Sequence, residues 1–323
     1  MARKVQHSLL TKAKTNKKDE FYTQLIDIES ELKHYENHFK DQVVYCNCDD
    51  PRVSNFFNYF SINFEKLGLK KIITACYKNK ENNLNENGFF SEYISDKGEK
   101  DITIEDKISV VPFNEDGDFR SLESIELLKK SDIVVTNPPF SLFREYVEQL
   151  IKYDKKFLII GNVNAITYKE IFKLIKENKA WLGIHLGRGI SGFIVPDHYE
   201  LYGTEARIDN SGNRIVSPNN CLWLTNLDTS KRHEDIILSK TYYGNESEYP
   251  KYDNYDGINV NKTKDIPMDF KGSMGVPITF LHKFNPDQFE IIKFRKGNDE
   301  KDLSINGKCP YFRILIKNKR LQS

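Results

Sequence analysis

DIVVTNPPF, residues 132–140, is the stretch that decides how the rest of the chain is interpreted. Its apolar run, residues 133–135, is typical of a buried strand. Two consecutive prolines, Pro138 and Pro139, follow shortly afterwards. Because proline has no backbone donor and a fixed φ, the run cannot continue as a central strand or become the interior of a helix. The sequence therefore predicts a strand that ends in a rigid loop beginning with Asn137.

Strands and helices alternate on both sides of this loop. Short apolar runs between turn residues predict strands at 43–46, 71–76, 108–111, 132–136, 156–161 and 221–224. Helical spacing of apolar residues predicts helices at 19–40, 53–66, 121–130, 141–153 and 167–177. A hairpin is predicted from segments 89–94 and 102–104. This alternation is typical of βαβ units, so we expect an α/β fold with a Rossmann-like, doubly wound, largely parallel sheet.

The predicted topology places polar residues where a ligand would bind. Ligands of such sheets lie beyond the carboxyl ends of the strands. Asn137 lies just past one such end, and Asp49 and Asp50 lie past another. The character of the sequence changes after residue 226 and loses most of its hydrophobic periodicity. We therefore expect two domains, 1–226 and 227–323, with the ligand-binding edge in the first.

Composition narrows the class of protein. No segment of the 323 residues has the apolar length that a membrane span needs, and no apolar stretch follows the basic start of the chain as in a secretory signal. An odd number of cysteines, five, and the absence of metal-ligand spacing predict reduced thiols, a cytoplasmic location and no metal site. Net charge is only +1, but residues 1–18 and 303–323 carry basic and no acidic side chains. These ends are either phosphate contacts or solubilising termini.

Asn-Pro-Pro-Phe has a specific chemical use at the end of a buried strand. An exocyclic amine such as adenine N6 is a poor nucleophile, because its lone pair is delocalised into the ring. It reacts better when acceptors hold its two N–H groups, and the Asn137 side chain and the Pro138 carbonyl can supply them. Pro139 adds no competing donor. Phe140 offers a face on which a flat ring can stack, worth about 1–3 kcal/mol. Preorganised acceptors of this kind stabilise a transition state without a metal.

The motif resembles the catalytic motif of S-adenosylmethionine-dependent amino-methyltransferases, in which asparagine favours adenine N6. Longer stretches are similar to the EcoRI-type modification methylase family over essentially the whole chain: DEFYTQ (19–24), VVYCNCDDPRVSNFF (43–57), KKSDIVVTNPPFSLFREY (129–146), HLGRGISGFIVP (185–196), SPNNCLWLTNLD (217–228) and FRILIKNKR (312–320). The resemblance implies a DNA adenine-N6 methyltransferase that acts on GAATTC in double-stranded DNA. It would protect host DNA from a restriction endonuclease that acts on the same site without contacting the enzyme.

The resemblance also implies cofactor-binding positions for S-adenosyl-L-methionine. They are Phe21, Tyr22 and Thr23 near the methionine part, Cys46, Asn47, Asp49 and Asp50 after the first strand, and Asp118 and Phe119 near the cofactor adenine. Two positions depart from the family pattern. Residues 52–55 stand where a glycine-rich loop is usual, and Ala75-Cys76-Tyr77 lacks the acidic residue that usually holds the ribose. Whether Asp49 or Asp50 binds the cofactor's amino group stays open.

Weaker signals concern DNA. Residues 187–192 fit Gly-x-Gly-x-x-Gly, but a strand-like segment follows, so we reject a dinucleotide site and expect a loop near DNA with Arg188 as a contact. Region 242–276 is either a polar surface loop or a target-recognition surface, which would make residues 227–323 the target-recognition region. The candidate contacts there are Tyr252, Asn254, Lys262 and Lys264.

The target base lies inside a duplex and would have to be flipped out. A monomer is expected. The alternative functions are methyl transfer to RNA guanine N2 or protein glutamine, and a non-catalytic DNA-binding protein on a methyltransferase fold.

Overall fold

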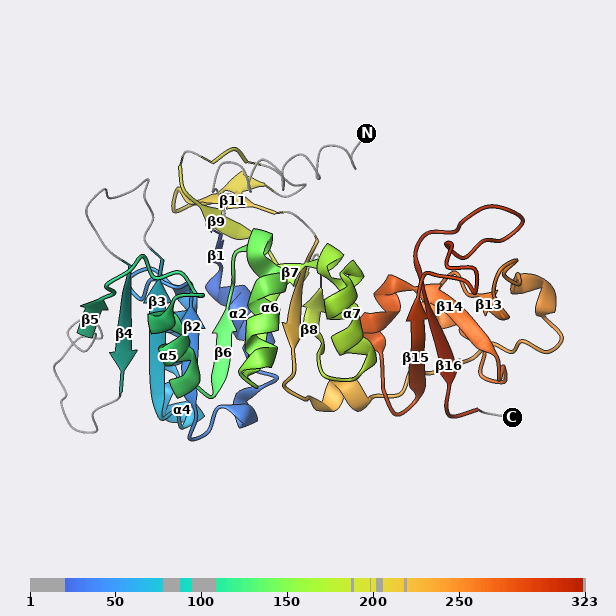
Figure 1. Cartoon of the computed structure of the whole chain (residues 1–323), viewed down its shortest axis with the longest axis horizontal. Coiled ribbons are helices and arrows are strands. Elements are labelled where there is room, and N and C mark those ends of the chain that lie inside the picture. Colours follow the sequence, from blue (N-terminus) through green and yellow to red (C-terminus); the bar gives the residue numbers. More distant parts are fainter. Residues whose placement is uncertain are drawn as a thin grey trace. The chain divides into compact units, whose positions relative to one another are not determined.

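A computed structural model of the chain describes residues 21–77, 88–94, 109–186, 189–197, 199–201, 206–217 and 220–321. The chain splits into two compact units (Figure 1). The first comprises Met1–Ile171 and Gly183–Leu227, and the second comprises Phe172–Leu182 and Asp228–Ser323. The boundary falls within α7 (Lys169–Lys176) and β8 (Trp181–Leu186).

An eight-stranded sheet runs through the first unit in the order β5-β4-β3-β2-β6-β7-β12-β8. Its strands besides β8 are β2 (Val43–Asn47), β3 (Lys71–Cys76), β4 (Phe89–Tyr93), β5 (Ser109–Pro112), β6 (Ile133–Thr136), β7 (Lys156–Asn162) and β12 (Cys221–Thr225). Strands β3, β2, β6 and β7 are parallel. Strands β4 and β5 pair antiparallel with their neighbours, and β12 pairs antiparallel with β7. These central strands are buried along nearly their whole length, which is why they are continuous apolar runs in the sequence.

The order of the strands creates a switch point at the centre of the sheet. From β2 the chain first builds β3, β4 and β5 on one side, and then returns to place β6 and β7 on the other. The register pairs Val44 with Ile133 and Tyr45 with Val134. The carboxyl ends of β2 and β6 therefore lie side by side, where open α/β sheets bind their ligands.

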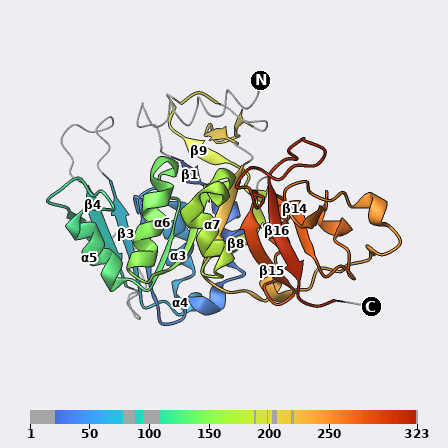
Figure 2. The ribbon, with the colours of Figure 1, turned by 45° about the vertical axis from the view of Figure 1, so that its right-hand side comes forward.

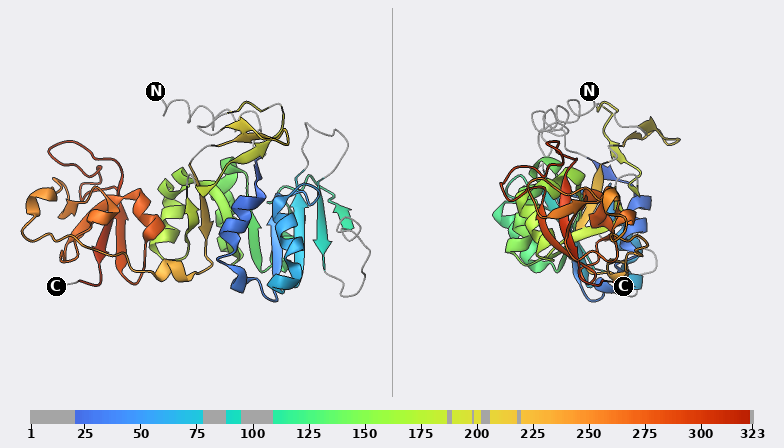
Figure 3. Two further views of the ribbon diagram at one scale, coloured as in Figure 1. Left: turned by 180° about the vertical axis from the view of Figure 1, so that it is seen from behind. Right: turned by 90° about the vertical axis from the view of Figure 1, so that its right-hand side faces the viewer.

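Helices cover both faces of this sheet. They are α2 (Leu25–Leu32), α3 (Asn55–Ile62), α4 (Phe64–Leu67), α5 (Leu122–Lys130), α6 (Phe143–Lys152) and α7. Helices α5 and α6 lie on the face turned to the viewer in Figure 1, and α2 and α3, in blue, lie on the face seen in Figure 3. Ser54 begins α3 as an N-cap, because its hydroxyl accepts hydrogen bonds from Phe56 N and Phe57 N, both at 3.2 Å.

A small antiparallel sheet joins the start of the described chain to a distant segment. Its order is β1 (Tyr22–Thr23), β9 (Phe193–Val195), β11 (Arg214–Val216) and β10 (Arg207–Ile208). Tyr22 pairs with Ile194 and Thr23 with Phe193, and Figure 2 shows β1 beside β9. The N-terminal Phe-Tyr-Thr segment is thus fixed by residues about 170 positions further along the chain.

The second unit has its own four-stranded sheet and core. The order is β13 (Gly257–Asn259), β14 (Ser273–Pro277), β16 (Arg313–Asn318) and β15 (Phe289–Phe294). Strands β13 and β14 are parallel and the other pairs are antiparallel. Two short 3-10 turns, Ser230–His233 and Glu246–Glu248, precede β13. Another, Thr263–Asp265, lies between β13 and β14, and Ile278–Lys283 lies between β14 and β15. Met274, Val276, Phe280, Leu315 and Ile316 are fully buried and form the centre of this core.

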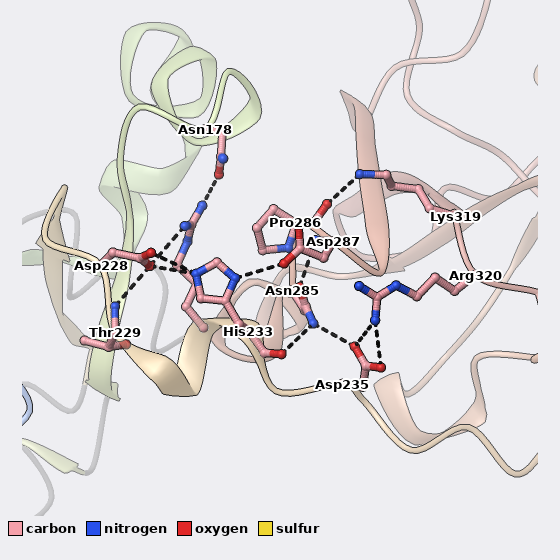
Figure 4. A network of polar contacts seen from close by, with 11 residues as sticks. Asn178, Asp228, Thr229, His233, Asp235, Asn285, Pro286, Asp287, Lys319 and Arg320 are labelled. Carbon is pink, nitrogen blue, oxygen red and sulfur yellow. Dashed lines mark hydrogen bonds and ion pairs between the residues drawn. The ribbon is translucent and has the colours of Figure 1, made fainter.

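In the second unit, a polar network connects the start of the segment Asp228–Ser323 to the rest of the unit (Figure 4). The His233 ring lies between two carboxylates, with Nε2 2.8 Å from Asp228 Oδ2 and Nδ1 2.9 Å from Asp287 Oδ2. Hydrogen bonds to Asp287 and Asp228 raise the pKa of His233. Asn285 donates to the His233 carbonyl at 3.0 Å and to Asp235 at 2.8 Å. The network therefore attaches this segment to the loop before β15.

Several predicted elements differ from those observed. The helix expected at 19–40 is interrupted, because residues 22–23 pair with β9, α2 ends at Leu32, and a 3-10 turn covers Glu36–His38. The helix expected at 53–66 is two helices, α3 and α4, which meet at Asn63.

The later helices also begin differently from the prediction. A 3-10 turn, Phe140–Leu142, precedes α6, and another, Val163–Thr167, precedes α7. Strand β4 pairs with β5. The predicted hairpin partner, 102–104, lies outside the described residues. The strands predicted at 43–46, 71–76, 132–136, 156–161 and 221–224 are confirmed, each within one residue at either end.

Candidate active site

Asn137 lies at the carboxyl end of β6, at the switch point. Its Nδ2 donates a hydrogen bond to the Phe21 carbonyl at 2.8 Å. Only the nitrogen of the amide can face a carbonyl, so this contact fixes the orientation of the side chain. Its Oδ1 is buried and has no hydrogen-bond partner among the described residues. A buried acceptor without a donor costs about 1–3 kcal/mol, so the site holds an acceptor that the protein itself does not satisfy.

Aromatic rings pack around Phe21, the residue whose carbonyl accepts from Asn137. Phe140 stacks on Phe21 with ring centroids 5.7 Å apart and planes at 21°. Phe193, from β9, meets both rings edge-on, at 6.0 Å from Phe140 and 5.8 Å from Phe21. Tyr199 lies edge-on to Phe21 at 6.4 Å. The sequence did not indicate Phe193 or Tyr199 as neighbours of Phe21, because the pairing of β1 with β9 joins segments far apart in the chain.

The turn after β2 adopts the backbone of a glycine turn without a glycine. Cys48 has a φ of 68°, in the left-handed region that glycine occupies most readily. The Asn47 side chain stabilises the turn, since its Oδ1 accepts from Cys48 N at 2.9 Å. Asp49 N donates to the Ala75 carbonyl at 2.9 Å and so joins the ends of β2 and β3. Cys48 therefore holds a strained backbone conformation, at a cost of order 1–3 kcal/mol.

Asp49 is held at the point where three elements meet. Thr136, the last residue of β6, donates its hydroxyl to Asp49 Oδ2 at 2.7 Å, and Ser54 at the start of α3 donates to Oδ1 at 2.8 Å. Burial raises the pKa of Asp49 to about 7, although both hydroxyl bonds oppose the shift. Asp50 has a different environment, because Arg52 donates hydrogen bonds to its carboxylate from Nε at 2.9 Å and from Nη2 at 2.7 Å. Asp50 is thus neutralised by a cation, whereas Asp49 is bound by neutral groups.

The Asp118-Phe119 pair lies against the end of β3. Gly117 has a φ of 78°, and a Cβ there would come within 2.6 Å of the Cys76 carbonyl, so this approach requires glycine. The Phe119 ring packs edge-on against Tyr146 at 5.0 Å. Burial raises the pKa of Asp118, but hydrogen bonds from Arg120 outweigh burial and hold that pKa below its usual value. The fold therefore brings a carboxylate to the strand end where Ala75-Cys76-Tyr77 lacks one.

Two acidic residues of α2 hold the segment that leads into β9. Glu31 is fully buried and accepts from Ile184 N at 2.7 Å, from His185 N at 2.9 Å and from the Tyr35 hydroxyl at 3.0 Å. Asp27 accepts from Ser191 through N at 3.0 Å and Oγ at 2.8 Å. The sequence did not indicate these roles, because acidic residues on an amphipathic helix are usually solvent-facing.

A strand, β9, follows the Gly-x-Gly-x-x-Gly stretch, as the sequence predicted. Arg188 lies outside the described residues. In the second unit, the Tyr252 hydroxyl is buried and donates to Asn259 at 3.0 Å. The Asn254 amide donates to the Asp302 carbonyl at 3.0 Å. Lys262 and Lys264 are exposed.

No group of three or more metal-ligating side chains occurs in the part of the chain that the structure describes. Among the same residues, no helix has the length and apolarity to cross a membrane.

An α/β sheet whose switch point presents Asn-Pro-Pro-Phe, an unsatisfied amide oxygen and an aromatic wall is the arrangement of an enzyme that methylates an amine. Residues 9–319 match the model of one family, described as adenine-specific methyltransferase EcoRI. The chain belongs to this family and is an adenine-specific methyltransferase.

Individual relatives agree with this assignment. The chain is 73% identical to the type II methyltransferase M.EcoRI of Escherichia coli over the full length of both. It is 38% identical to M.MgeORF184P of Mycoplasma genitalium and 37% identical to M.MpnI of Mycoplasma pneumoniae, with 96% of this chain and 98% of each relative covered. Both are also type II methyltransferases. No solved structure matches the chain.

Proposed function

We propose that the protein transfers a methyl group from S-adenosyl-L-methionine to N6 of adenine in duplex DNA, at GAATTC. Methylation would protect host DNA from a restriction endonuclease that cleaves the same site. The observation that carries this proposal is the buried Asn137 Oδ1, which has no donor among the described residues. The amide nitrogen of the same side chain bonds the carbonyl of Phe21, whose ring stacks on Phe140. The type II methyltransferase names of the relatives support DNA modification.

The residues after β6 would hold the target amine by its two N–H groups. Asn137 Oδ1 accepts one of them and the Pro138 carbonyl accepts the other. The Pro139 carbonyl is engaged elsewhere, since it accepts from Leu142 N at 3.0 Å. Because both acceptors are fixed in place before the base arrives, they favour the tetrahedral nitrogen of the transition state at no cost in reorganisation.

The edge of the sheet also fits the cofactor, whose sulfonium supplies the methyl group when bound. A carboxylate without a cationic partner suits a cationic amino group. Among the described residues Asp49 has no such partner, whereas Asp50 is neutralised by Arg52. We therefore assign the amino group to Asp49. Asp118 and Phe119 would hold the adenosine part, with Asp118 in place of the acidic residue that β3 lacks. Phe21, Tyr22, Thr23, Cys46 and Asn47 would complete the site.

The raised pKa of Asp49 predicts a pH-dependent cofactor affinity. Asp49 must lose its proton to pair with the amino group, so the wild-type affinity will rise as pH increases from about 5 to about 7 and level off above its pKa of about 7. The stability of the free protein changes with pH in the opposite direction. Because folding raises the pKa of Asp49, this group contributes folding stability at pH values below its unfolded-state pKa, and the contribution is lost as pH rises towards about 7.

Titration calorimetry across this pH range, in buffers of different ionisation enthalpy, measures both the affinity and the released proton. Asp49→Asn should bind more weakly and without the pH dependence. Asp50→Asn is the matched control and should keep it. A flat wild-type profile, or loss of the dependence in Asp50→Asn instead, would show that the assignment is wrong.

Phe140→Ala should weaken placement of the flipped base. Base–aromatic stacking is worth about 1–3 kcal/mol, so we expect productive placement to fall by about 5- to 150-fold. One face of the ring is already covered by Phe21, so the base would use the other face or displace Phe21. A fluorescent adenine analogue in the target position reports flipping directly, with Phe140→Tyr as a control that retains the ring. Unchanged fluorescence in Phe140→Ala would count against stacking.

We further propose that the eight-stranded sheet is a Rossmann-like, doubly wound methyltransferase sheet, with residues 1–226 as the catalytic domain and 227–323 as the DNA target-recognition region. The enzyme would act as a cytoplasmic monomer. The site assignment is tested with two duplexes that contain GAATTC or a variant changed at one base pair. Methylation confined to the first duplex, with resistance to the cognate endonuclease, is the expected result. Equal methylation of both would refute the site.

A further inference from the structure

Arg313, at the start of β16, is a buried cation without a carboxylate partner. It is only 9% exposed, and its three guanidinium nitrogens all donate to neutral oxygens. Nε donates to Asn259 Oδ1 at 3.0 Å, Nη1 to the Tyr311 carbonyl at 2.7 Å, and Nη2 to Asn261 Oδ1 at 3.3 Å. No salt bridge to Arg313 is found among the described residues.

The positive charges of other arginines in the same unit are balanced by carboxylates. Arg295 pairs with Asp302 at 2.8 Å, and Arg320 pairs with Asp235 at 3.0 Å. Burial of an ion carries an effective penalty of several kcal/mol unless an opposite charge offsets it. Burial accordingly lowers the pKa of Arg313, although an arginine stays charged at neutral pH. Arg313 is thus the buried cation of this unit that lacks a negative charge within the described chain.

The guanidinium retains donors for a partner from outside. It carries five N–H groups, and the three bonds above use one on each nitrogen, so one N–H remains on each of Nη1 and Nη2. The Nε bond is buried, whereas the bonds of Nη1 and Nη2 are only partly buried. The terminal nitrogens also lie beside surface residues, since Asn261 is exposed and Tyr311 is 63% exposed.

We propose that Arg313 is a preformed fork for a backbone phosphate of the bound DNA, with Asn259 and Asn261 as the residues that position it. A phosphate supplies the missing negative charge and accepts two parallel N–H bonds. A base edge offers acceptors but no charge, so it would leave the buried cation uncompensated. The inference rests on the proposed function in DNA methylation, and names one contact through which the second unit would hold that substrate.

Asn261→Asp tests the inference while it preserves the size of the side chain. The new carboxylate would lie about where Asn261 Oδ1 now is, 3.3 Å from Nη2, and would neutralise Arg313 from within. A role of Arg313 in folding alone predicts that this variant is as stable as the wild type or more stable, with unchanged DNA binding. A phosphate fork predicts the same stability but weaker DNA binding.

The decisive readout is the salt dependence of DNA affinity. Each neutralised phosphate contributes about 0.9 to the slope of log K against log salt. Between 50 and 200 mM salt, wild-type affinity should therefore fall about three- to fourfold more than that of Asn261→Asp. The loss at low salt should be equal for a target duplex and an unrelated duplex. Arg313→Lys, which keeps the charge but not the fork, should weaken both duplexes to a smaller extent.

Gln42→Glu is the matched control for the added negative charge. Gln42 lies just before β2, at the end of that strand away from the candidate site, and its side-chain amide makes an exposed hydrogen bond to the Lys40 carbonyl. An unchanged slope in Asn261→Asp, or the same change in Gln42→Glu, would overturn the proposal. A loss of affinity confined to the target duplex would indicate that Arg313 contacts a base edge and not a phosphate, and would also overturn the proposal. If the wild type neither binds nor methylates DNA, the proposed function itself fails, which is distinguishable from a wild type that does both.

Discussion

Asn137→Ala will lower the rate of methyl transfer by about 10²–10³-fold or more, because it removes the side-chain acceptor that favours the reacting form of the amine. Cofactor binding should fall much less than methyl transfer. Asp49 and Asp118, which are assigned to the cofactor, do not depend on Asn137, and only the Phe21 segment loses a hydrogen bond. Single-turnover transfer of a labelled methyl group measures the first quantity, and equilibrium titration with the cofactor measures the second.

A second variant separates chemistry from structure. Asn137 also ties β6 to the N-terminal segment through its bond to the Phe21 carbonyl. Asn137→Asp keeps an acceptor of the same size but loses this donor. We expect it to retain more activity than Asn137→Ala, although its hold on the Phe21 segment is weaker. Wild-type turnover in Asn137→Ala would remove Asn137 from the mechanism.

Glu31→Ala should be the most destabilising of these substitutions. It leaves the amides of Ile184 and His185 and the Tyr35 hydroxyl without their buried acceptor. Removing one partner from a buried charged network typically costs about 3–5 kcal/mol, and we expect an effect of that size on the free energy of unfolding. Methyl transfer should fall as well, because the segment that Glu31 holds leads into β9 and Phe193.

Urea denaturation measures the global effect, and hydrogen exchange at the amides of residues 184 and 185 detects local detachment. Glu29→Ala is the matched control, since Glu29 lies on the same helix and is exposed. It should change stability by less than about 0.5 kcal/mol. If Glu31→Ala resembles Glu29→Ala and both amides stay protected, the anchoring role is wrong.

The sequence was sufficient to predict the central sheet. Buried parallel strands must be apolar along their whole length, so β2, β3, β6 and β7 are visible as short apolar runs. The two prolines after Asn137 also marked the end of β6 as unusual. A local physical rule therefore predicted both the strand and the residue expected to act at its end.

What the sequence could not predict depends on contacts between distant segments. Strand β1 has only two residues, and it forms only because β9 pairs with it. Phe193 has the sequence context of an ordinary apolar residue until that pairing brings it to Phe140. Cys48 has a positive φ that its neighbours hold in place, and no local propensity favours cysteine there. Long-range pairing and backbone strain are not encoded in hydrophobic periodicity.

The most direct test of the proposed activity is to supply labelled S-adenosyl-L-methionine with duplex DNA, RNA and protein in parallel, and to analyse the nucleosides and amino acids of each product. We expect N6-methyladenine in the DNA and no label elsewhere. Label in RNA guanine or in protein glutamine, with no N6-methyladenine in the DNA, would contradict it.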